Sequence, residues 1–593
     1  MQLKYFLMLL AFYILPYIFY LSISHGLGHK AVYLQLRRFI PCAISASLPA
    51  ILAQLPLNSN IFISSLIIGL SWIITYPLLY YLTYRKTSPD FGFHLDIVFG
   101  LYCISWLTSL KILIINFNIL PIFLLSVISI IEFIIILLPI VQWIYYLLYK
   151  SVISESALLM IQGTHHNEII EYFKSLPIYY HILSLSSIFL FISLLLNLNL
   201  NYKTISLPLS YSFILIVLAV FLTTYLFKKN HGVFIRTGLI KSYSDVKKYI
   251  KQALFYQTNL QKRINALKVT PNKPNFSKPS TIIMVIGESE SRDYMSAFTD
   301  YEFNTTPWLL SKKDNKNFIL FPKTYSTVTN TIFCLEKALT EANQYNDKSF
   351  ASSCSVIDIA HKAGYKTYWY SNQGYLEGSS TSVSVLANTA QTAKWTSQNS
   401  KQIQYDESLL DYLPEINPAE NNFVVLHLKG SHFNFINRYP KEFTKWGEPG
   451  KYDLLPNYLN TIAYTDSFLE KVFEYAKKHL NLQAMLYFSD HACKPDNRRS
   501  PDFDGFASVR IPMFAYFSDE YITKHSDTFN ALSKNRNKYF TNDLVYELMC
   551  GIFDIKSNHY DETNSLASTK YKYTRDMLKT ALGTIYINQD NND

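Results

Sequence analysis

The chain has 593 residues, of which 49% are hydrophobic and 16% aromatic, and its formal net charge is +10. The positive charge is spread widely. No dense block of Lys and Arg with interleaved aromatic residues appears, which argues against nucleic-acid binding. A mild attraction to anionic lipid surfaces fits this charge better.

The first part of the chain is dominated by long apolar stretches that are nearly free of charge. Residues 5–24 form one such stretch, and residues 39–57, interrupted by Pro41 and Pro49, form a weaker one. A cleaved signal peptide is disfavoured, because further apolar stretches follow at once and residues 22–29 make a poor cleavage site. Five more stretches approach or exceed the ~20 residues needed to cross a bilayer: 61–84, 97–115, 119–148, 182–200 and 207–227. We predict a polytopic membrane domain of five to seven helices over residues 1–229.

The segments that flank these spans give little information on orientation but include candidates for contact with the membrane surface. Lys and Arg clusters at residues 30–38, 85–86 and 228–229 do not alternate cleanly, so the positive-inside rule gives only a weak indication. Residues 162–173 form a polar segment between two spans, which an ordinary connecting loop would explain. Residues 244–254 have the pattern of a basic amphipathic helix, suited either to the headgroup layer or to packing against a soluble domain.

A polar linker with several prolines closes the region 230–279 and marks a domain boundary. Residues 280–593 are ample for one large α/β core. Four cysteines in this part could form two disulfides in three ways, and no spacing resembles a zinc knuckle: Cys334, Cys354, Cys493 and Cys550. An oxidising compartment is compatible with this pattern, and the pairing is left open.

Five short apolar runs in this second part predict the strands of an α/β sheet. Helical patterns separate them, for example at residues 355–364 and 458–480, which is typical of central strands covered on both faces. In open sheets of this kind ligands bind beyond the carboxyl ends of the strands. The carboxylates, imidazoles and amide that end the first four runs are therefore expected to meet at one edge of a sandwich of helices around a sheet, whereas the fifth run ends without an ionisable residue. The runs are 281–287, 365–370, 422–428, 484–489 and 510–517.

Two of the runs end in residues suited to a metal ion. Glu288 follows the first run, and the pair Asp490 and His491 ends the fourth. A single Glu at a strand end is usually only solvated, but an adjacent Asp-His pair is a good ligand set for zinc or manganese. With Glu288 as a third ligand, one coordination position would stay open. We predict one divalent metal, with zinc as the first choice and manganese as the second.

A nucleophile near that metal is expected in residues 325–341, which change from a hydroxyl-rich turn to a helical pattern around Asn330 and Thr331. A Thr at a helix N-terminus lies where backbone N–H groups favour phosphate. Metal coordination could lower the pKa of its hydroxyl and make it attack phosphorus. A plain N-cap would explain the same residue. Thr327, Thr329 and Thr331 compete for the role, and spacing does not choose among them.

Two histidines and an amide follow other runs. His427 and His432 bracket Leu-Lys-Gly-Ser, and either could protonate a leaving alkoxide or bind phosphoryl oxygens. A structural role is an equal alternative for His427. Asn372 is a neutral donor suited to a phosphate oxygen, or else a turn residue.

Taken together, these segments resemble the membrane-anchored phosphoethanolamine transferases of the alkaline phosphatase superfamily, which modify lipid A, core sugars or related glycans. The resemblance covers most of the chain, and the order GES-x-SRD, H-x4-H and SDH is its most specific part. The matching segments are 285–298 (VIGESESRDYMSAF), 304–307 (NTTP), 324–340, 369–373 (WYSNQ), 427–432, 457–466 (NYLNTIAYTD), 489–491 and 564–566.

The resemblance implies which residues act. Thr331 would be the nucleophile, His432 and Asn372 would contact the phosphoryl group, and His432 would assist proton transfer, while substrate binding by His427 is predicted from its position near the end of its apolar run. Residues 162–173 resemble a loop that faces the lipid substrate. The catalytic domain would lie in the periplasm, anchored in the inner membrane of a Gram-negative cell. The resemblance also implies a zinc-like site formed by Glu288, Thr331, Asp490 and His491.

The sequence departs from the family pattern at the substrate side of this site. After SDH the family commonly continues Gly-Glu with a further His downstream, whereas residues 492–494 are Ala-Cys-Lys and no His precedes residue 517. The Lys expected four residues beyond Asn372 is Leu376. Arg498 or Arg499 could supply a cationic contact instead. The sulfatase nucleophile pattern C-x-P-x-R is absent, which argues against sulfate ester hydrolysis.

The reaction implied is a two-step transfer. Thr331 attacks the phosphodiester of phosphatidylethanolamine and releases diacylglycerol, and the phosphoethanolamine-threonine is then attacked by lipid A or an LPS-core sugar. A phosphoglycerol transferase of glycan or teichoic-acid type would share the fold. A non-catalytic membrane scaffold is a further alternative. A transporter has little support, because no run of intramembrane charges marks a pathway.

Overall fold

The computed structural model describes two compact units. One comprises Met1–Leu158 with Glu168–Lys247, and the other Leu159–Asn167 with Lys248–Asp593. The predictions for Leu376, Arg498, Arg499 and the loop segment 164–173 fall outside the described residues. These are residues 3–23, 37–84, 93–163, 178–273, 276–373, 381–396, 403–495 and 503–592.

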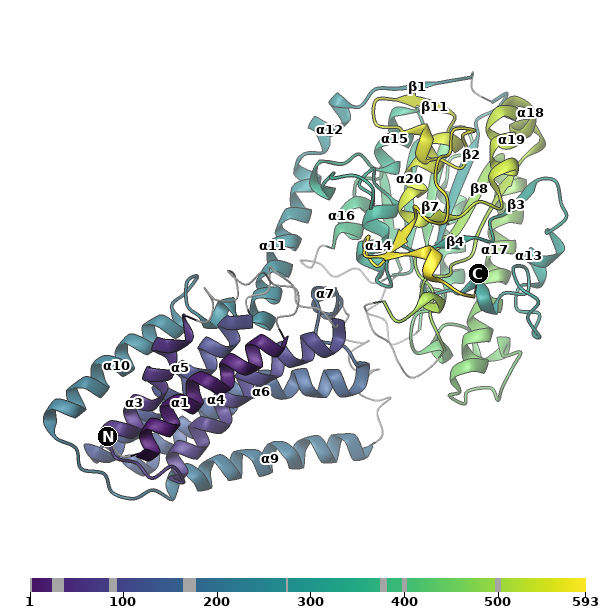
Figure 1. Ribbon diagram of the computed structural model, residues 1–593. Coiled ribbons are helices and arrows are strands. Elements are labelled where there is room, and N and C mark those ends of the chain that lie inside the picture. The colour runs from purple at the N-terminus through teal and green to yellow at the C-terminus, as the bar shows by residue number, and fades with distance from the viewer. Residues whose placement is uncertain are drawn as a thin grey trace. The chain divides into compact units, whose positions relative to one another are not determined.

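The first unit is a bundle of apolar helices (Figure 1). In the described part of the chain six helices are long and apolar enough to cross a membrane. The predicted polytopic domain is confirmed, and the weaker candidate at 39–57 is the short helix α3 (Phe39–Leu52). The six are α1 (Leu3–Ile23), α4 (Asn60–Tyr84), α5 (Phe93–Asn116), α6 (Pro121–Tyr149), α9 (Ile178–Leu200) and α10 (Leu209–Phe227).

A buried ion pair lies inside this bundle. Lys111 of α5 pairs with Glu132 of α6, and neither side chain is exposed. Lys111 Nζ also donates to Ser64 Oγ of α4 at 2.5 Å, and Asn199 Nδ2 of α9 donates to Glu132 Oε2 at 2.6 Å. Sequence analysis missed the pair, because each charge stands alone in its own apolar run. Polar side chains of four helices thus satisfy one another where lipid could not.

Two helices contribute residues to both units, α7 (Glu155–Gly163) and α11 (Gly238–Thr258). The second half of α11 packs into the core of the second unit through Ala253 and Tyr256. The Tyr256 hydroxyl donates to Asp358 Oδ2 at 3.2 Å. Of the two alternatives for the basic amphipathic segment, packing against the soluble domain describes this half. Helix α12 (Leu260–Ala266) and strand β1 (Val269–Pro271) follow.

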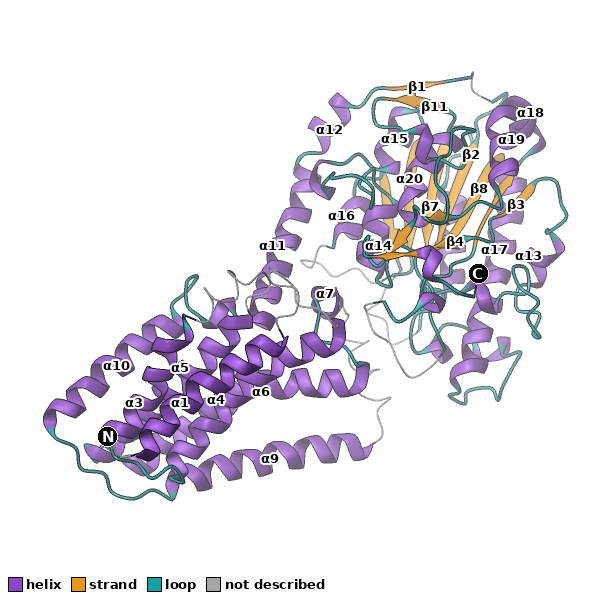
Figure 2. Ribbon diagram, viewed as in Figure 1, coloured by secondary structure: helices purple, strands orange, loops and turns teal. Residues whose placement is uncertain are grey.

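The second unit is built on a seven-stranded sheet (Figure 2). Four of the five predicted runs are parallel neighbours in it, but β9 runs antiparallel to β8. The fifth run, residues 510–517, contains β9 and therefore ends at the opposite edge from the other four. The order is β3 (Phe318–Leu320), β9 (Met513–Phe517), β8 (Leu482–Ser489), β2 (Thr281–Gly287), β7 (Asn422–His427), β5 (Lys366–Ser371) and β6 (Thr392–Trp395).

Helices cover both faces of the sheet (Figure 2), which is why its central strands are apolar without alternation. In β2, Ile282, Met284 and Ile286 face one core, and Ile283 and Val285 face the other. The predicted α/β/α sandwich is confirmed. The first core includes residues of α14 (Thr331–Ala338), α15 (Val356–Lys362), α16 (Ser382–Ala387), α18 (Asp519–Lys524), α19 (Ser526–Asn535) and α20 (Val545–Ile552). The second includes residues of α13 (Pro307–Ser311) and α17 (Leu454–His479).

Candidate active site

The ends of four parallel strands bring the predicted site residues to one edge of the sheet. The register pairs Gly287 of β2 with Ser489 of β8, and both Ile286 and Ser371 with His427 of β7. The carboxyl ends of these four strands therefore lie side by side at the same edge of the sheet. The residues that follow them come from distant parts of the sequence but start from neighbouring points.

Three potential metal ligands meet at this edge. Glu288, Asp490 and His491 each offer one donor atom, and these atoms lie within 4.8 Å of one another. His491 Nε2 is 3.5 Å from Glu288 Oε1 and 3.4 Å from Asp490 Oδ2. Around a tetrahedral zinc ion with bonds of about 2.1 Å, ligand atoms stand about 3.4 Å apart. The two distances from His491 Nε2 are compatible with ligands around one ion.

The hydrogen bonds around Asp490 and His491 leave one donor atom available on each residue. Asp490 Oδ1 accepts from the backbone N–H groups of Ser289 (3.0 Å) and His491 (2.6 Å). The buried Asp490 Oδ2 has no hydrogen-bond partner among the described residues. His491 Nδ1 lies 3.0 Å from the carbonyl oxygen of Ala492, so it donates there and leaves the Nε2 lone pair for the cluster. These donors fit a divalent metal.

The electrostatics of Glu288 also favour a cation. Burial raises the pKa of its carboxyl, and the neighbouring Asp490 carboxylate raises it further. The imidazoles of His491 and His432, when protonated, and a hydrogen bond from Ser289 lower that pKa and only partly offset the increase. Two buried carboxylates side by side are unfavourable without positive charge between them.

The backbone around Glu288 is strained and crowded. Ser289 has φ +59°, in the left-handed region, and its hydroxyl donates to Glu288 Oε1 at 2.6 Å. Gly430 has φ +44°, and a Cβ there would lie 2.9 Å from the Glu288 carbonyl oxygen. Ser431 N–H donates to that same oxygen at 2.9 Å. Backbone strain of this kind is maintained mainly at functional sites.

Thr331 is the first residue of α14 and lies beside the ligand cluster. Its hydroxyl donates to Glu288 Oε2 at 3.0 Å and lies 3.5 Å from His491 Nε2. Asn330 is the N-cap, since its Oδ1 accepts from the N–H of Phe333 at 3.2 Å. The hydroxyl of Thr331 is therefore not used for capping.

The two predicted histidines differ in their surroundings. His427 is only 4% exposed, and burial lowers its pKa to about 4, so the ring is neutral. His432 is half-buried, and its charge lowers the pKa of Glu288. The Arg438 guanidinium donates to the His432 carbonyl oxygen at 3.1 Å and fixes this loop. The substrate contacts of both histidines stay predictions.

Asn372 is fully buried, and its amide is engaged within the protein. Its Nδ2 donates to Asp406 Oδ1 at 2.8 Å, and its Oδ1 accepts from the Thr396 hydroxyl at 2.6 Å. Its contact with a phosphoryl group stays a prediction. The next residue, Gln373, donates from Nε2 to Glu288 Oε2 at 3.2 Å.

Sequence reasoning gave no role to Gln373 or Asp406. Gln373 lies in the family-like segment WYSNQ and could have been found there. No sequence pattern marked Asp406 as a functional residue. Its carboxylate accepts from the backbone N–H groups of Lys429 (2.8 Å) and Gly430 (2.9 Å), and so ties the end of β5 to the loop that joins His427, the last residue of β7, to His432.

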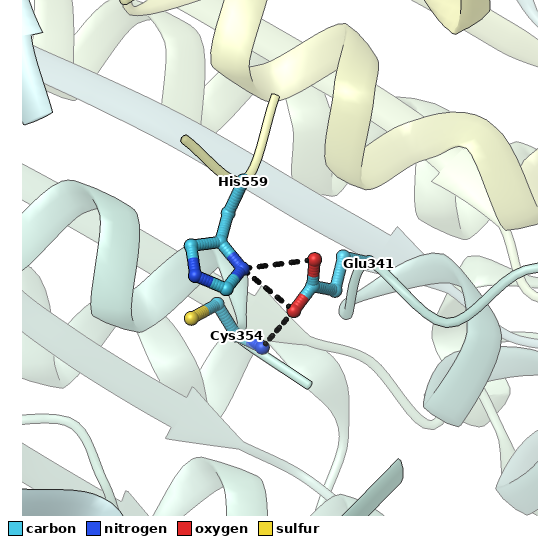
Figure 3. A group of neighbouring side chains, drawn as sticks. All are labelled: Glu341, Cys354 and His559. Carbon is cyan, nitrogen blue, oxygen red and sulfur yellow. Dashed lines mark hydrogen bonds and ion pairs between the residues drawn. The ribbon is translucent and has the colours of Figure 1, made fainter. Parts of the chain in front are cut away.

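A second group of metal-type ligands, Glu341, Cys354 and His559, is shown in Figure 3. His559 Nδ1 lies 2.9 and 3.0 Å from the two carboxylate oxygens of Glu341, which also accepts from Cys354 N–H at 2.9 Å and pairs with Lys348. Burial raises the pKa of the Cys354 thiol to about 12. The Glu341 carboxylate thus already has hydrogen-bond and ion-pair partners, and the Cys354 thiol is protonated. The group therefore connects segments of the chain that are distant in sequence.

The fold and this edge define the class of the second unit. Residues 280–550, within the second unit, match the Sulfatase family model. With the helices of the first unit, the chain is a multi-pass membrane protein with an α/β domain that resembles this family.

Its relatives are phosphoethanolamine transferases, which confirms the resemblance. Phosphoethanolamine transferase EptC of Escherichia coli is 26% identical over 345 residues, which are 53% of this chain and 59% of the relative. A putative phosphoethanolamine transferase of Haemophilus influenzae is 30% identical over 272 residues, 43% and 54% of the two chains. The chain thus spans about three fifths of the length of the first of these relatives.

One solved structure matches across both units. It is the integral membrane protein lipooligosaccharide phosphoethanolamine transferase A of Neisseria meningitidis, with a TM-score of 0.56 and 18% sequence identity. The match covers 86% of this chain and 98% of that one. At this identity the likeness concerns the fold.

Proposed function

We propose that the protein transfers phosphoethanolamine from phosphatidylethanolamine to an envelope glycolipid, either lipid A or a sugar of the LPS core. The observation that carries the proposal is the position of Thr331, whose hydroxyl lies 3.0 Å from Glu288 Oε2 and 3.5 Å from His491 Nε2. The names of the relatives supply the transferred group.

The proposal includes one divalent metal, zinc in preference to manganese, held by Glu288, Asp490 and His491 together with Thr331. Mixed nitrogen and oxygen donors at this spacing support zinc. When bound, the ion would supply positive charge that lowers the pKa of a nearby hydroxyl and stabilises phosphoryl oxygens.

The side chains of the site divide the work. Thr331 Oγ reacts after losing its proton to solvent and forms a bond to the phosphorus of the donor, and the bond from phosphorus to the diacylglycerol oxygen breaks; when the acceptor later displaces it, Thr331 Oγ leaves again as the oxyanion. His432 gives a proton to that leaving oxygen and, in the second step, takes the proton of the acceptor hydroxyl. The acceptor oxygen then displaces Thr331 from phosphorus. Most of the acceleration comes from positioning and charge stabilisation.

We propose that the domain faces the periplasm and that the spans lie in the inner membrane of a Gram-negative cell. The support is the set of relatives, which come from such bacteria. The spans would keep two lipid substrates near the site and raise their effective concentration.

The experiment that tests the covalent step compares Thr331→Ala with the wild type in diacylglycerol release from labelled phosphatidylethanolamine. We expect no release and no phosphoethanolamine on the protein. Thr340→Ala is the control, because Thr340 is buried on the same part of the chain and in the described structure its hydroxyl donates to the Glu336 carbonyl oxygen, at 2.7 Å, and not to the ligand cluster. Undiminished release by Thr331→Ala would reject the proposal.

The transferred group is identified by mass spectrometry of envelope glycolipids from cells with and without the protein. Phosphoethanolamine and phosphoglycerol add different masses. A glycerol phosphate adduct would point to the phosphoglycerol transferase alternative, and no adduct at all would favour a non-catalytic scaffold.

A further inference from the structure

One buried amide touches three of the segments that build the candidate site. Asn542 begins the turn after β10 (Phe540–Thr541) and is fully buried. Its Nδ2 donates to the carbonyl oxygen of Asp490 at 2.6 Å and to Cys334 Sγ at 3.0 Å. Its Oδ1 accepts from both the N–H and the hydroxyl of Thr327, each at 2.9 Å.

Each of these segments carries a part of the site. Asp490 is a ligand in the cluster and precedes the ligand His491. Cys334 lies on α14, one turn beyond Thr331. Thr327 lies in the hydroxyl-rich turn that leads into α14. Asn542 is 208 residues from Cys334 and 215 from Thr327 along the chain, so it joins them only in the folded protein.

Helix α14, which begins at Thr331, also contacts the backbone of Asp490 directly. Cys334 Sγ donates to the same Asp490 carbonyl oxygen at 2.8 Å. That oxygen therefore has two donors, one from α14 and one from Asn542. A shift of this peptide would move the carboxylate of Asp490 and the imidazole of His491 together, and it would change their distance to Thr331.

We propose that Asn542 is a positioning residue that fixes the distance between the Thr331 hydroxyl and the ligand cluster. The inference deepens the proposed function and rests on it. An amide suits this place because it donates on one side and accepts on the other. An Asp side chain could still accept from Thr327, but its carboxylate would face the Asp490 carbonyl oxygen with no proton to donate.

The test uses Asn542→Asp in the full-length protein. The matched control is Asn535→Asp, because Asn535 is also buried and its Nδ2 donates to two backbone carbonyl oxygens, those of Leu566 and Ser568, both at 2.9 Å. A displacement of about 1 Å at a reacting group costs on the order of 100-fold in rate. We therefore expect kcat for diacylglycerol release to fall about 10- to 100-fold in Asn542→Asp, with KM nearly unchanged. In Asn535→Asp we expect kcat to stay at the wild-type value.

A second readout separates this inference from the proposed function. The protein is loaded with Co²⁺, whose visible absorption spectrum reports ligand geometry. We expect the spectrum of Asn542→Asp to differ from the wild type and that of Asn535→Asp to match it. If the wild type releases no diacylglycerol, the proposed function fails, and the cobalt spectra alone decide the role of Asn542.

Variants of Cys334 keep the test decisive where Asn542→Asp does not fold. Cys334→Ala removes one donor to the Asp490 carbonyl oxygen, and Cys334→Ser restores a donor. We expect kcat to fall in the first and to recover at least partly in the second. Equal loss of kcat in Asn542→Asp and Asn535→Asp, or wild-type kcat and spectrum in Asn542→Asp, would overturn the proposal. The same holds if Cys334→Ala retains wild-type kcat.

Discussion

Gln373 donates from Nε2 to Glu288 Oε2 across 3.2 Å, although 85 residues of chain separate the two. It also donates to the Leu428 carbonyl oxygen at 2.7 Å, so its amide is held in place. Residues that orient a ligand in this way contribute about 10- to 100-fold to metal affinity. We expect Gln373→Ala to weaken zinc binding by that factor, measured by competition with a chelator of known affinity.

The control for this prediction is Gln391→Ala. Gln391 also binds the backbone through its side chain, since its Oε1 accepts from the Thr367 N–H at 2.9 Å, but it contacts no residue of the cluster among its hydrogen bonds in the described structure. Zinc affinity should be unchanged in this variant. Equal affinity in both variants would contradict an orienting role for Gln373.

Gly430 allows the loop between His427 and His432 to approach Glu288 closely. A Cβ at this position would lie 2.9 Å from the Glu288 carbonyl oxygen and 3.0 Å from its nitrogen, both backbone atoms that cannot move aside easily. We expect Gly430→Ala to reduce turnover on the order of 100-fold, because the ligand and the loop must separate. Steady-state kinetics of diacylglycerol release measures this.

Gly364→Ala distinguishes this effect from backbone strain alone. Gly364 also has a positive φ, +89°, but a Cβ there would meet nothing within 4 Å. The substitution should cost roughly 1 kcal/mol or more of stability. Turnover should stay at the wild-type value. A similar loss of turnover in both variants would argue against the close approach as the cause.

Stability should depend on pH through Glu547. Burial raises the pKa of this carboxyl from 4.5 to about 8. The folded state therefore binds the proton more tightly than the unfolded state, so the stability that the protonated group contributes is complete below pH 4.5 and is lost as pH rises towards about 8. Glu547→Gln removes this loss and can still accept from the Asp561 N–H, which Glu547 Oε2 does at 3.0 Å.

We expect the unfolding temperature of Glu547→Gln to exceed that of the wild type by an amount that grows between about pH 5 and about pH 8. Scanning fluorimetry of the full-length protein at several pH values measures it. The exposed Glu562 supplies the control, and Glu562→Gln should follow the wild type. A difference that shrinks with rising pH would contradict the assignment.

The ion pair of Lys111 and Glu132 predicts a rescue. Lys111→Met leaves the Glu132 carboxylate buried without its cation, and breaking such a pair costs about 3–5 kcal/mol. The folded fraction, measured by size-exclusion chromatography in detergent, should fall sharply. Adding Glu132→Gln should restore it, since the remaining amide can still bind Asn199. A double variant as unstable as the single one would contradict the pairing.

Much of the fold could be predicted from apolar runs. Strands that are buried on both faces tend to be continuously apolar, so an apolar run predicts such a strand. This holds for β2, β5, β7 and β8. A run carries no information on direction, however, so the antiparallel orientation of β9 was missed. Strands β3 and β6 span only three and four residues, too short to show any period.

The candidate site was predictable where a residue directly follows a strand. Glu288, Asp490 and His491 have this signal, and Thr331 was selected by family resemblance. Asn542 has no such signal, because its partners are backbone groups and a thiol in segments far along the chain. Residues that act through hydrogen bonds to the backbone leave no spacing pattern in a sequence.

The buried pair of Lys111 and Glu132 bears on how the chain enters a bilayer during synthesis. A single charge near the middle of a helix disfavours its release from the translocon by about 2.5–3.5 kcal/mol. Helices α5 and α6 are consecutive, with only residues 117–120 between them, and the charges of Lys111 and Glu132 cancel. Insertion of both helices as one hairpin avoids exposing either charge alone to lipid. We therefore expect α5 to leave the translocon only after α6 has been synthesised.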